Sequence, residues 1–503
     1  MNTSTPHLVR LAPVALSLLL LAGCGTKVVN PVSGQAERSV MDEQTEIAEG
    51  RKAHQAVLAE YGVLANPKLQ AYVNGVGQKL AKESHRANLA WTFTVLDSPD
   101  INAFALPGGY VYVTRGIMAY LESEADLAGV LGHEIGHVTA RHGAQRATSQ
   151  RNAGIGVMAA TVLGVLVEGV TGVSGTAQAA SQIGQGVAQG RLASYSREQE
   201  TQADQLGAEY LSRTRYNPRN MIDVIQVLKR QERFVADRAQ AEGRAAPSGA
   251  NWLASHPSND KRLADIQQVA ARYTGTYDDD GQARYLQAIE GLPFGDTAAK
   301  GLVRGQHFYH QDLGIALTAP PGWQVQNADE SVTVVNGAMD AGLVMRLLPA
   351  QAGNGHEDII RNVVKPVDGR TEKRSFNGLS ATHFAGTRRN AQGQAQGVQV
   401  SVVSGPGSRN YLMQYLGKDA ASLQRADAQL QQAESSFRAM TAADRAVARP
   451  WVLRTVPYPR GGFAELARSS PLNLQAEAYL KLLNGVYGGG PEPRPGSPVK
   501  VVQ

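Results

Sequence analysis

The sequence predicts a multidomain protein in which a mostly α-helical domain with a small β-sheet precedes an α+β domain and a small β-α-α-β module. The chain has 503 residues, 43% of them hydrophobic and 18% charged, which is enough for roughly two to four domains with their own cores. Helical periodicity dominates from about 40 to 290, and short alternating stretches dominate from about 305 to 440. The expected segments are 1–23 as a signal, 24–45 as a tether, 46–295 as the helical domain, 305–440 as the α+β domain and 450–503 as the module.

The N-terminal segment has the features of a bacterial secretion signal. Arg10 is followed by the apolar run "LAPVALSLLLLAG", which is too short to span a membrane, and then by Cys24, the only cysteine. The stretch "LLAGC" resembles a lipobox, which implies cleavage before Cys24 and lipidation of its thiol. Gly25 is not the aspartate that retains such lipoproteins in the inner membrane, so we expect an outer-membrane lipoprotein facing the periplasm. The alternative is an ordinary secretion signal with an incidental cysteine.

The charge pattern argues against a nucleic-acid-binding protein, and the cysteine content excludes a fold held by disulfides within the chain. The formal charge of +5 comes from 49 basic and 44 acidic residues spread along the chain, a pattern that does not predict a nucleic-acid groove. With one cysteine, a disulfide within the chain is impossible. The polar, turn-rich stretch "GTKVVNPVSGQ" after Cys24 is typical of a tether.

In the helical domain, two segments rich in β-branched and aromatic residues predict a strand pair. They are "WTFTVL" (91–96) and "YVYVT" (110–114), joined by a loop containing "LPGG". The rest of 40–290 follows helical patterns.

The stretch "LGHEIGHVTARHG" (131–143) predicts a metal-binding helix. In helical projection His133 and His137 lie about 40° apart and therefore share one face. Glu134 lies beside them, in the H-E-x-x-H arrangement: two imidazoles bind Zn²⁺, and the glutamate takes a proton from water without being a ligand. A separate apolar stripe is expected to face the core: Leu127, Leu131, Ile135 and Val138.

A catalytic zinc of this kind needs a third protein ligand. A third histidine in the pattern H-E-x-x-H-x-x-G-x-x-H is excluded, because Ala140 stands at the glycine position and Gly143 at the histidine position. His142 falls one residue short, and we expect it at the surface or at a helix end.

The segment "SREQETQADQLGAEYL" (196–211) offers a carboxylate instead. Ser196 and Gln199 form a capping box that begins a helix. Glu200 and Asp204 project onto the inward stripe of that helix, where an unpaired carboxylate costs several kcal/mol. Zinc for Glu200 and a histidine ring N–H for Asp204 would satisfy both. The alternative is two solvated acids at a helix edge.

Four blocks in this order resemble the gluzincin family of membrane-associated zinc endopeptidases that includes HtpX, the CAAX prenyl proteases and BepA. The blocks are "NAFALPGGYVYVTRG" (102–116), "HEIGH" (133–137), "SREQETQAD" (196–204) and "SHPSNDKRL" (255–263). The resemblance implies a zincin-like protease domain with one Zn²⁺ per chain. It places the zinc ligands on His133, His137 and Glu200, the general base on Glu134, and an aspartate that supports a ligand on Asp204.

The resemblance also places His256 near the metal. There it either stabilises the oxyanion of the transition state or caps the zinc in a latent form, and the sequence does not choose between these roles. A third alternative is a histidine that only precedes Pro257 at a helix entry.

Two further segments of the domain bear on substrate access. We expect "YVYVT" to be an exposed edge strand on which Tyr110, Val111 and Tyr112 pair with an extended polypeptide; the alternative is an interior strand. The Gly-, Ala- and Val-rich segment 154–190 predicts two closely packed helices over the site, which touch lipid or move as a lid.

The C-terminal parts predict folds rather than chemistry. Residues 305–440 resemble the small α+β domains of the PsbP and Mog1 type, and end in the helical run "DAASLQRADAQLQQAESSFRAM". Residues 450–503 resemble a LysM module, for which binding of peptidoglycan sugars and a purely structural docking role stay open alternatives.

Two functions follow from the sequence. The first is a zinc endopeptidase acting on unfolded or misassembled envelope polypeptides, anchored to the membrane by an N-terminal lipid. The second is a lipid-anchored envelope chaperone or peptidoglycan tether with a capped, largely inactive zinc site.

Overall fold

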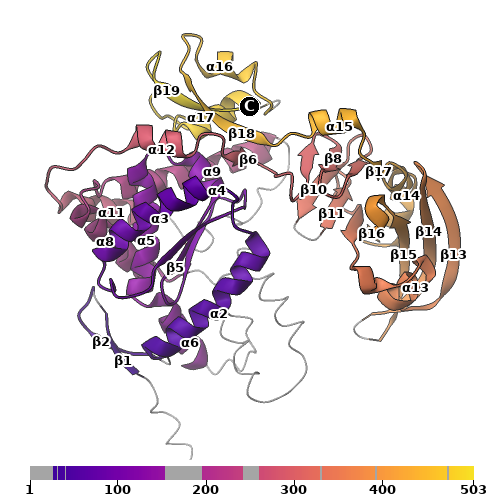
Figure 1. Ribbon diagram of the computed structural model, residues 1–503, viewed down its shortest axis with the longest axis horizontal. Helices are drawn as coiled ribbons and strands as arrows, with labels where there is room; N and C mark the ends of the chain where they lie inside the picture. The colour runs from indigo at the N-terminus through magenta and orange to yellow at the C-terminus, as the bar shows by residue number, and fades with distance from the viewer. Residues whose placement is uncertain are drawn as a thin grey trace, which may run out of the picture. The chain divides into compact units, whose positions relative to one another are not determined.

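The computed structural model describes residues 26–30, 32–39, 41–152, 195–241, 256, 260–328, 331–390, 393–472 and 475–503. The expected signal 1–23, Cys24 and the segment 154–190 lie outside these residues. The chain divides into two compact units, Met1–Leu292 with Val452–Gln503 (unit 1) and Pro293–Trp451 (unit 2) (Figure 1). The N-terminal region is helical with small sheets, and the region after it is rich in sheet, in agreement with the predicted multidomain class.

Unit 1 is built mainly from helices. They are α2 (Glu43–Tyr61), α3 (Pro67–Lys82), α4 (Arg115–Tyr120), α5 (Glu124–Thr139), α6 (His142–Asn152), α8 (Arg197–Arg213), α9 (Asn220–Ala241), α11 (Asp260–Ala271), α12 (Gln282–Ala288), α16 (Gly462–Ala467) and α17 (Ala476–Leu483). Side-chain caps fix where several of them begin: Ser123 accepts a hydrogen bond from the Asp126 N–H at the start of α5. The capping box of Ser196 and Gln199 at the start of α8 is confirmed in both directions. In the part of the chain that the structure describes, no helix is both long and apolar enough to cross a membrane.

The small sheet of unit 1 has three strands in the order β3-β5-β4. These strands are β3 (Thr92–Leu96), β4 (Ala103–Leu106) and β5 (Tyr110–Thr114). β3 runs parallel to β5, and β4 runs antiparallel to it. The expectation that "YVYVT" is an exposed edge strand is therefore wrong: β5 is the central strand, because the segment before "LPGG" forms a strand of its own and pairs with the side of β5 that was expected to be free.

Helix α5 is buried on every side, and each of its residues from Glu124 to Thr139 is buried. It packs closely against α8 through small residues. A Cβ built on Gly136 would lie 2.7 Å from the Ala203 carbonyl oxygen, and one built on Gly207 would lie 3.1 Å from the backbone nitrogen of His133. The expected apolar stripe of α5 is inside, but so is its polar face. A helix whose charged face is buried requires partners for every charge.

The C-terminal segment packs on the helices of unit 1. Strands β18 (Trp451–Pro457) and β19 (Pro498–Val502) pair antiparallel, with α16 and α17 between them in the chain, which is the expected β-α-α-β order. The Phe234 ring of α9 meets Tyr479 of α17 with ring centroids 4.5 Å apart, and the Tyr487 hydroxyl donates to Asp237 at 2.7 Å. The Lys500 ammonium of β19 donates to the carbonyls of Ala119 and Leu121 at the end of α4.

Unit 2 contains a seven-stranded sheet in the order β10-β11-β12-β16-β15-β14-β13 and a four-stranded sheet in the order β17-β9-β8-β7. Its elements are β6 (Pro293–Phe294), β7 (Leu302–Arg304), β8 (His307–His310), β9 (Ile315–Thr318), β10 (Gln324–Ala328), β11 (Ser331–Val335), β12 (Ala341–Leu347), α13 (His356–Ile359), β13 (Pro366–Phe376), β14 (Leu379–Arg389), β15 (Ala395–Ser404), β16 (Asn410–Gly417), α14 (Ala420–Ser435), β17 (Arg438–Ala439) and α15 (Ala442–Val447). Leu430 and Ala433 of the predicted helix α14 pack into one core with strand residues such as Leu343 and Met413.

Candidate metal centre

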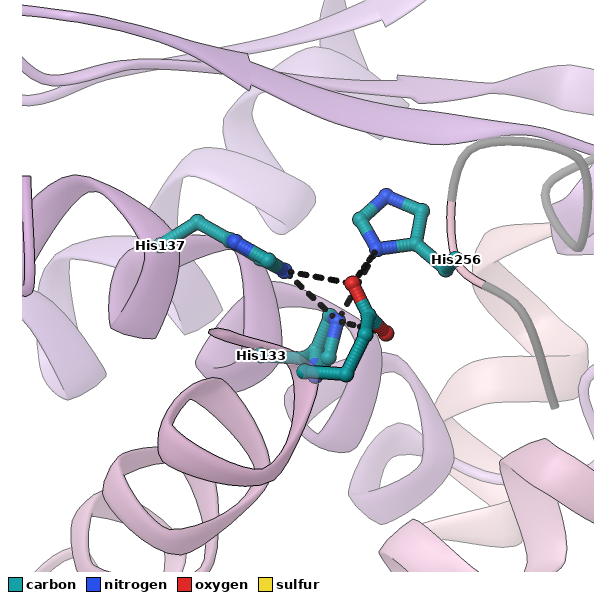
Figure 2. Close-up of side chains that lie close together, drawn as sticks. His133, His137 and His256 are labelled. Atoms are coloured by element: carbon teal, nitrogen blue, oxygen red, sulfur yellow. Dashed lines mark hydrogen bonds and ion pairs between the residues drawn. The ribbon is translucent and has the colours of Figure 1, made fainter. Parts of the chain in front are cut away.

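Four buried side chains converge in unit 1 (Figure 2). Helix α5 supplies His133 and His137, helix α8 supplies Glu200, and His256 precedes α11 in the chain. One ligand atom from each of the four lies within 4.8 Å of the other three, and each residue is at most 2% exposed. Helix geometry makes this possible, since residues four apart on α5 present both rings to the same side.

The distances between these atoms fit a tetrahedral zinc ion. His133 Nε2 is 3.0 Å from His137 Nε2 and 3.2 Å from His256 Nδ1. The Glu200 Oε1 atom is 2.9 Å from His256 Nδ1 and 3.3 Å from His137 Nε2. Zinc bound tetrahedrally at about 2.0–2.1 Å requires donor atoms about 3.3 Å apart. Three imidazole nitrogens and one carboxylate oxygen, all out of water, are a donor set that zinc prefers, so the residues fit the ion.

The ring of His133 is oriented by the acid expected to support it. Its Nδ1 atom lies 2.8 Å from Asp204 Oδ1, and because an ionised carboxylate only accepts, the hydrogen resides on Nδ1. The lone pair of His133 Nε2 is thereby directed into the cluster. This is the carboxylate–histidine–metal arrangement found behind many zinc ligands.

Arg262 of α11 holds both acids of α8 in place, a role that the sequence did not predict. Its guanidinium contacts Asp204 through Nε at 2.7 Å and through a terminal nitrogen at 2.8 Å, and reaches Glu200 Oε2 at 2.6 Å. The two inward carboxylates were a signal that a cation was needed near them. Arg262 lies in the block "SHPSNDKRL" (255–263), but nothing in the sequence paired it with these two acids.

Burial and charge set the ionisation of this cluster. Burial raises the pKa of Glu200, but the charges of His256 and Arg262 outweigh it and hold that pKa well below its usual value. Burial raises the pKa of Asp204 as well, but the charge and hydrogen bonds of Arg262 and the hydrogen bond with His133 together outweigh it and lower that pKa. Burial acts to lower the pKa of His133, yet its hydrogen bond and charge interaction with Asp204 raise it overall. Burial holds the pKa of His137 well below its usual value.

His142 is buried behind His137, so the expected surface position is wrong, whereas the alternative position at a helix end is confirmed. It is the first residue of α6, is 0% exposed, and its Nδ1 lies 2.9 Å from His137 Nδ1. Burial lowers the pKa of His142 to about 4. The Tyr195 ring stacks on His137 with centroids 3.8 Å apart. The sequence showed only that His142 is five residues after His137, and not that the chain turns at Ala140 and Arg141 to bring it back.

The expected general base lies next to the cluster. Glu134 is 0% exposed, and its Oε1 atom is 3.5 Å from His256 Nε2. His256 thus has one ring nitrogen within the ligand cluster and the other directed at Glu134.

The three residues expected to bind substrate are not at the centre. Val111 and Tyr112 are 0% exposed in the middle of the sheet, and the Tyr110 ring stacks on His54. The strand next to the metal centre is β4, whose Ala105 and Leu106 line a small pocket together with His137 and Tyr195. In the described part of unit 1, β4 is the outer strand of the sheet on this side.

Comparison with known proteins agrees with this geometry. Residues 67–270 match the profile of Peptidase family M48. The chain is 28% identical over 246 residues to a Beta-barrel assembly-enhancing protease of Yersinia pestis, a match that covers 48% of this chain and 47% of the relative. It is 29% identical over 242 residues to the Mitochondrial metalloendopeptidase OMA1 of Schizosaccharomyces pombe, covering 47% of this chain and 65% of the relative.

The chain therefore spans about half the length of the first of these curated relatives. Among solved structures, cyanobacterial PsbP (CyanoP) from Synechocystis sp. PCC 6803 is 14% identical, covers 29% of this chain and 98% of its own, and has a TM-score of 0.20. A likeness at that score does not define the fold of any part of this chain. The family profile, by contrast, covers His133, His137, Glu200 and His256 together. Residues 67–270 thus resemble Peptidase family M48, and these four side chains form a buried cluster consistent with one zinc ion in a metalloendopeptidase of that kind.

Proposed function

We propose that this chain is a zinc-dependent endopeptidase that cleaves misfolded or stalled proteins of the cell envelope. One observation carries the proposal: a buried His-His-Glu-His cluster has Glu134 fully buried beside it, one residue after the first ligand. A structural zinc site needs four ligands and no acid next to them. A carboxylate buried at such a centre is suited to general base catalysis.

The residues of the chain divide the reaction between them. His133, His137 and Glu200 would hold the ion, which when bound supplies Lewis acidity that polarises the scissile carbonyl group and acidifies water. Glu134 accepts the proton of the attacking water and then donates it to the amine of the leaving peptide. Asp204 and Arg262 keep His133 and Glu200 in position, since each hydrogen bonds a ligand or its partner.

Substrate recognition through main-chain hydrogen bonds suits β4 rather than β5. An outer strand next to the metal pairs with an extended polypeptide and places few demands on its side chains. Unfolded segments meet that requirement and folded domains do not. The relatives named beta-barrel assembly-enhancing proteases support envelope proteins as the substrate class.

The proposed location is the periplasmic side of the outer membrane. Its support is the sequence of the signal segment with Cys24 as the lipidated residue. Binding of peptidoglycan by the LysM-like segment 450–503 is a further part of the proposal. It rests on sequence resemblance and the β-α-α-β order.

A second function is favoured by the position of His256. Its Nδ1 atom lies where a fourth ligand would be, which supports an envelope chaperone or tether with a capped, largely inactive zinc. Such a protein would need zinc for its structure and would not need Glu134.

The test compares the wild-type protein with Glu134→Gln. We expect both to bind one zinc ion per chain, and we expect the variant to lose cleavage of unfolded casein by a factor of at least a hundred. Undiminished cleavage of casein by a zinc-loaded Glu134→Gln variant would contradict the endopeptidase proposal. Full complementation of a gene deletion by this variant would support the capped-zinc function instead.

A further inference from the structure

A chain of hydrogen bonds connects the N-terminal hairpin to the zinc ligand His137. The hairpin consists of β1 (Thr26–Val29) and β2 (Ala36–Ser39), which pair antiparallel. It lies within 24–45, where the sequence predicts a tether, so that prediction is wrong for the described part of this segment. Asn30 follows β1, is 3% exposed, and donates from Nδ2 to Gln202 Oε1 at 3.0 Å. Gln202 Oε1 also lies 3.1 Å from His142 Nε2, and His142 Nδ1 lies 2.9 Å from His137 Nδ1.

The hairpin fixes the orientation of the Asn30 amide. Its oxygen accepts hydrogen bonds from the backbone N–H groups of Val32 at 2.9 Å and Ser33 at 3.2 Å. Its nitrogen donates one hydrogen to Glu37 Oε1 at 2.9 Å. Backbone N–H groups only donate and a carboxylate only accepts, so the amide cannot be reversed. The second hydrogen on Nδ2 must therefore point to Gln202.

This orientation determines where the ring hydrogens lie. Because Gln202 presents its oxygen to His142 Nε2, the ring hydrogen of His142 is on Nε2 and its Nδ1 is an acceptor. That acceptor receives the hydrogen of His137 Nδ1. The remaining nitrogen of His137, Nε2, then carries a lone pair directed into the ligand cluster, which is the state that a zinc ligand requires.

We propose that Asn30, Gln202 and His142 form a relay through which the N-terminal hairpin fixes the metal-binding tautomer of His137. The relay does for His137 what Asp204 does for His133, with neutral groups in place of a carboxylate. These are positioning residues, and none of the three belongs to the ligand cluster. The proposal rests on the zinc function proposed above and adds that zinc affinity depends on the hairpin that precedes α2 in the chain.

Two substitutions that each add one negative charge to the relay distinguish a change of the His137 tautomer from a general effect of added charge on zinc binding. Asn30→Asp removes both donors, so Gln202 is expected to turn its NH₂ group toward the new carboxylate and toward His142. The relay then reverses and places a hydrogen on His137 Nε2. Gln202→Glu keeps an acceptor for both Asn30 and His142 and preserves the relay. We expect the dissociation constant for zinc to rise at least tenfold in Asn30→Asp and to stay within about threefold of wild type in Gln202→Glu.

The measurements use the full chain. Zinc affinity is determined by competition with a chromophoric chelator, and the tautomer of His137 is determined from the ¹⁵N shifts of its ring nitrogens in the zinc-free protein. Lys27→Ala, an exposed change in β1, is the control for the hairpin and should leave both readouts unchanged. His142→Asn, which retains an acceptor near the position of Nδ1, should bind zinc more tightly than His142→Leu.

Equal zinc affinities of wild type and Asn30→Asp, with the same ring shifts, would overturn the relay. So would an equal weakening by Gln202→Glu and Asn30→Asp, which would indicate a general disturbance of the site. If the wild-type protein bound zinc but did not cleave casein, this result would contradict the proposed endopeptidase function and would not contradict the relay.

Discussion

His256 lies where its ring can either cap the zinc ion, which lowers activity, or stabilise the transition state, which raises activity. Its Nδ1 atom is 2.9 Å from Glu200 Oε1 and 3.2 Å from His133 Nε2, distances that match one edge length of a zinc tetrahedron. A side chain at this vertex excludes the water that hydrolysis requires. We therefore expect His256→Ala to raise basal cleavage of casein at least threefold at full zinc occupancy, with kcat changing more than KM. Lower activity in the zinc-loaded variant would mean that His256 supports the transition state.

Single residues also mark where prediction from sequence ends. The i, i+4 spacing of His133 and His137 was enough to predict that both rings share one face of α5. Glu200 as third ligand and His256 near the metal came from the family resemblance, because spacing alone left the α8 carboxylates open between a metal site and a solvated helix edge. Arg262 was not predictable, since it meets Asp204 across 58 positions of sequence and no periodicity links the two. The burial of His142 was missed for a similar reason: it depends on the turn between α5 and α6, in which Arg141 adopts a positive φ of 58°.

At the scale of elements, the close contact of α5 and α8 brings Glu200 to the two rings. A Cβ on Gly136 would lie 2.7 Å from the carbonyl oxygen of Ala203 and 3.0 Å from its Cα, and neither backbone atom can move without moving α8. We expect Gly136→Ala to destabilise unit 1 by about 1–3 kcal/mol. It should also weaken zinc binding about tenfold or more, because the helix carrying Glu200 is displaced.

Gly75→Ala is the matched control for this prediction. Gly75 lies within α3, and a Cβ there would meet nothing within 4 Å, so the change should stabilise the helix by about 0.5–1 kcal/mol and leave zinc affinity unaltered. Chelator competition and thermal unfolding of both variants check the pair. Wild-type zinc affinity in Gly136→Ala would show that the separation of α5 and α8 does not control the site.

Element type was easier to predict than element pairing. Helices α5, α8 and α14 were predicted from their periodicity, and so were strands β3 and β5. At β4 the sequence predicts a loop, because "AFAL" has only four residues and runs directly into "PGG", which is a turn signal. Its pairing with β5 depends on tertiary context, and missing this strand changed which strand is adjacent to the zinc site.

At the scale of the whole molecule, the last fifty residues share a compact unit with the helical domain. The sequence showed a β-α-α-β pattern but not its packing surface, because the contacts join residues hundreds of positions apart. Phe234 with Tyr479 and Asp237 with Tyr487 are two of these contacts. Neither the sequence of α9 nor that of the C-terminal segment, taken alone, shows a pattern that marks these aromatic and polar residues as contact residues.

Lys500 makes another of these contacts, and its titration provides a test of the packing. Its ammonium is buried and caps the end of α4, donating to Ala119 O at 2.8 Å and Leu121 O at 2.7 Å. Burial lowers the pKa of Lys500 to about 8 from 10.5. Between those two pH values the unfolded chain holds more protons at this residue than the folded chain, so stability rises with pH across that window and is flat below it.

Lys500→Met removes this titration, so the stability of wild type relative to the variant should increase between pH 8 and pH 10.5, by a total on the order of 3 kcal/mol. Urea titrations of the full chain, read by pulse-labelling hydrogen exchange of peptides from unit 1, isolate that difference from unit 2. The tyrosines and other titrating groups are common to both proteins and cancel in the comparison. A pH-independent difference between the two proteins would mean that Lys500 is solvated, and that β19 does not dock at the end of α4.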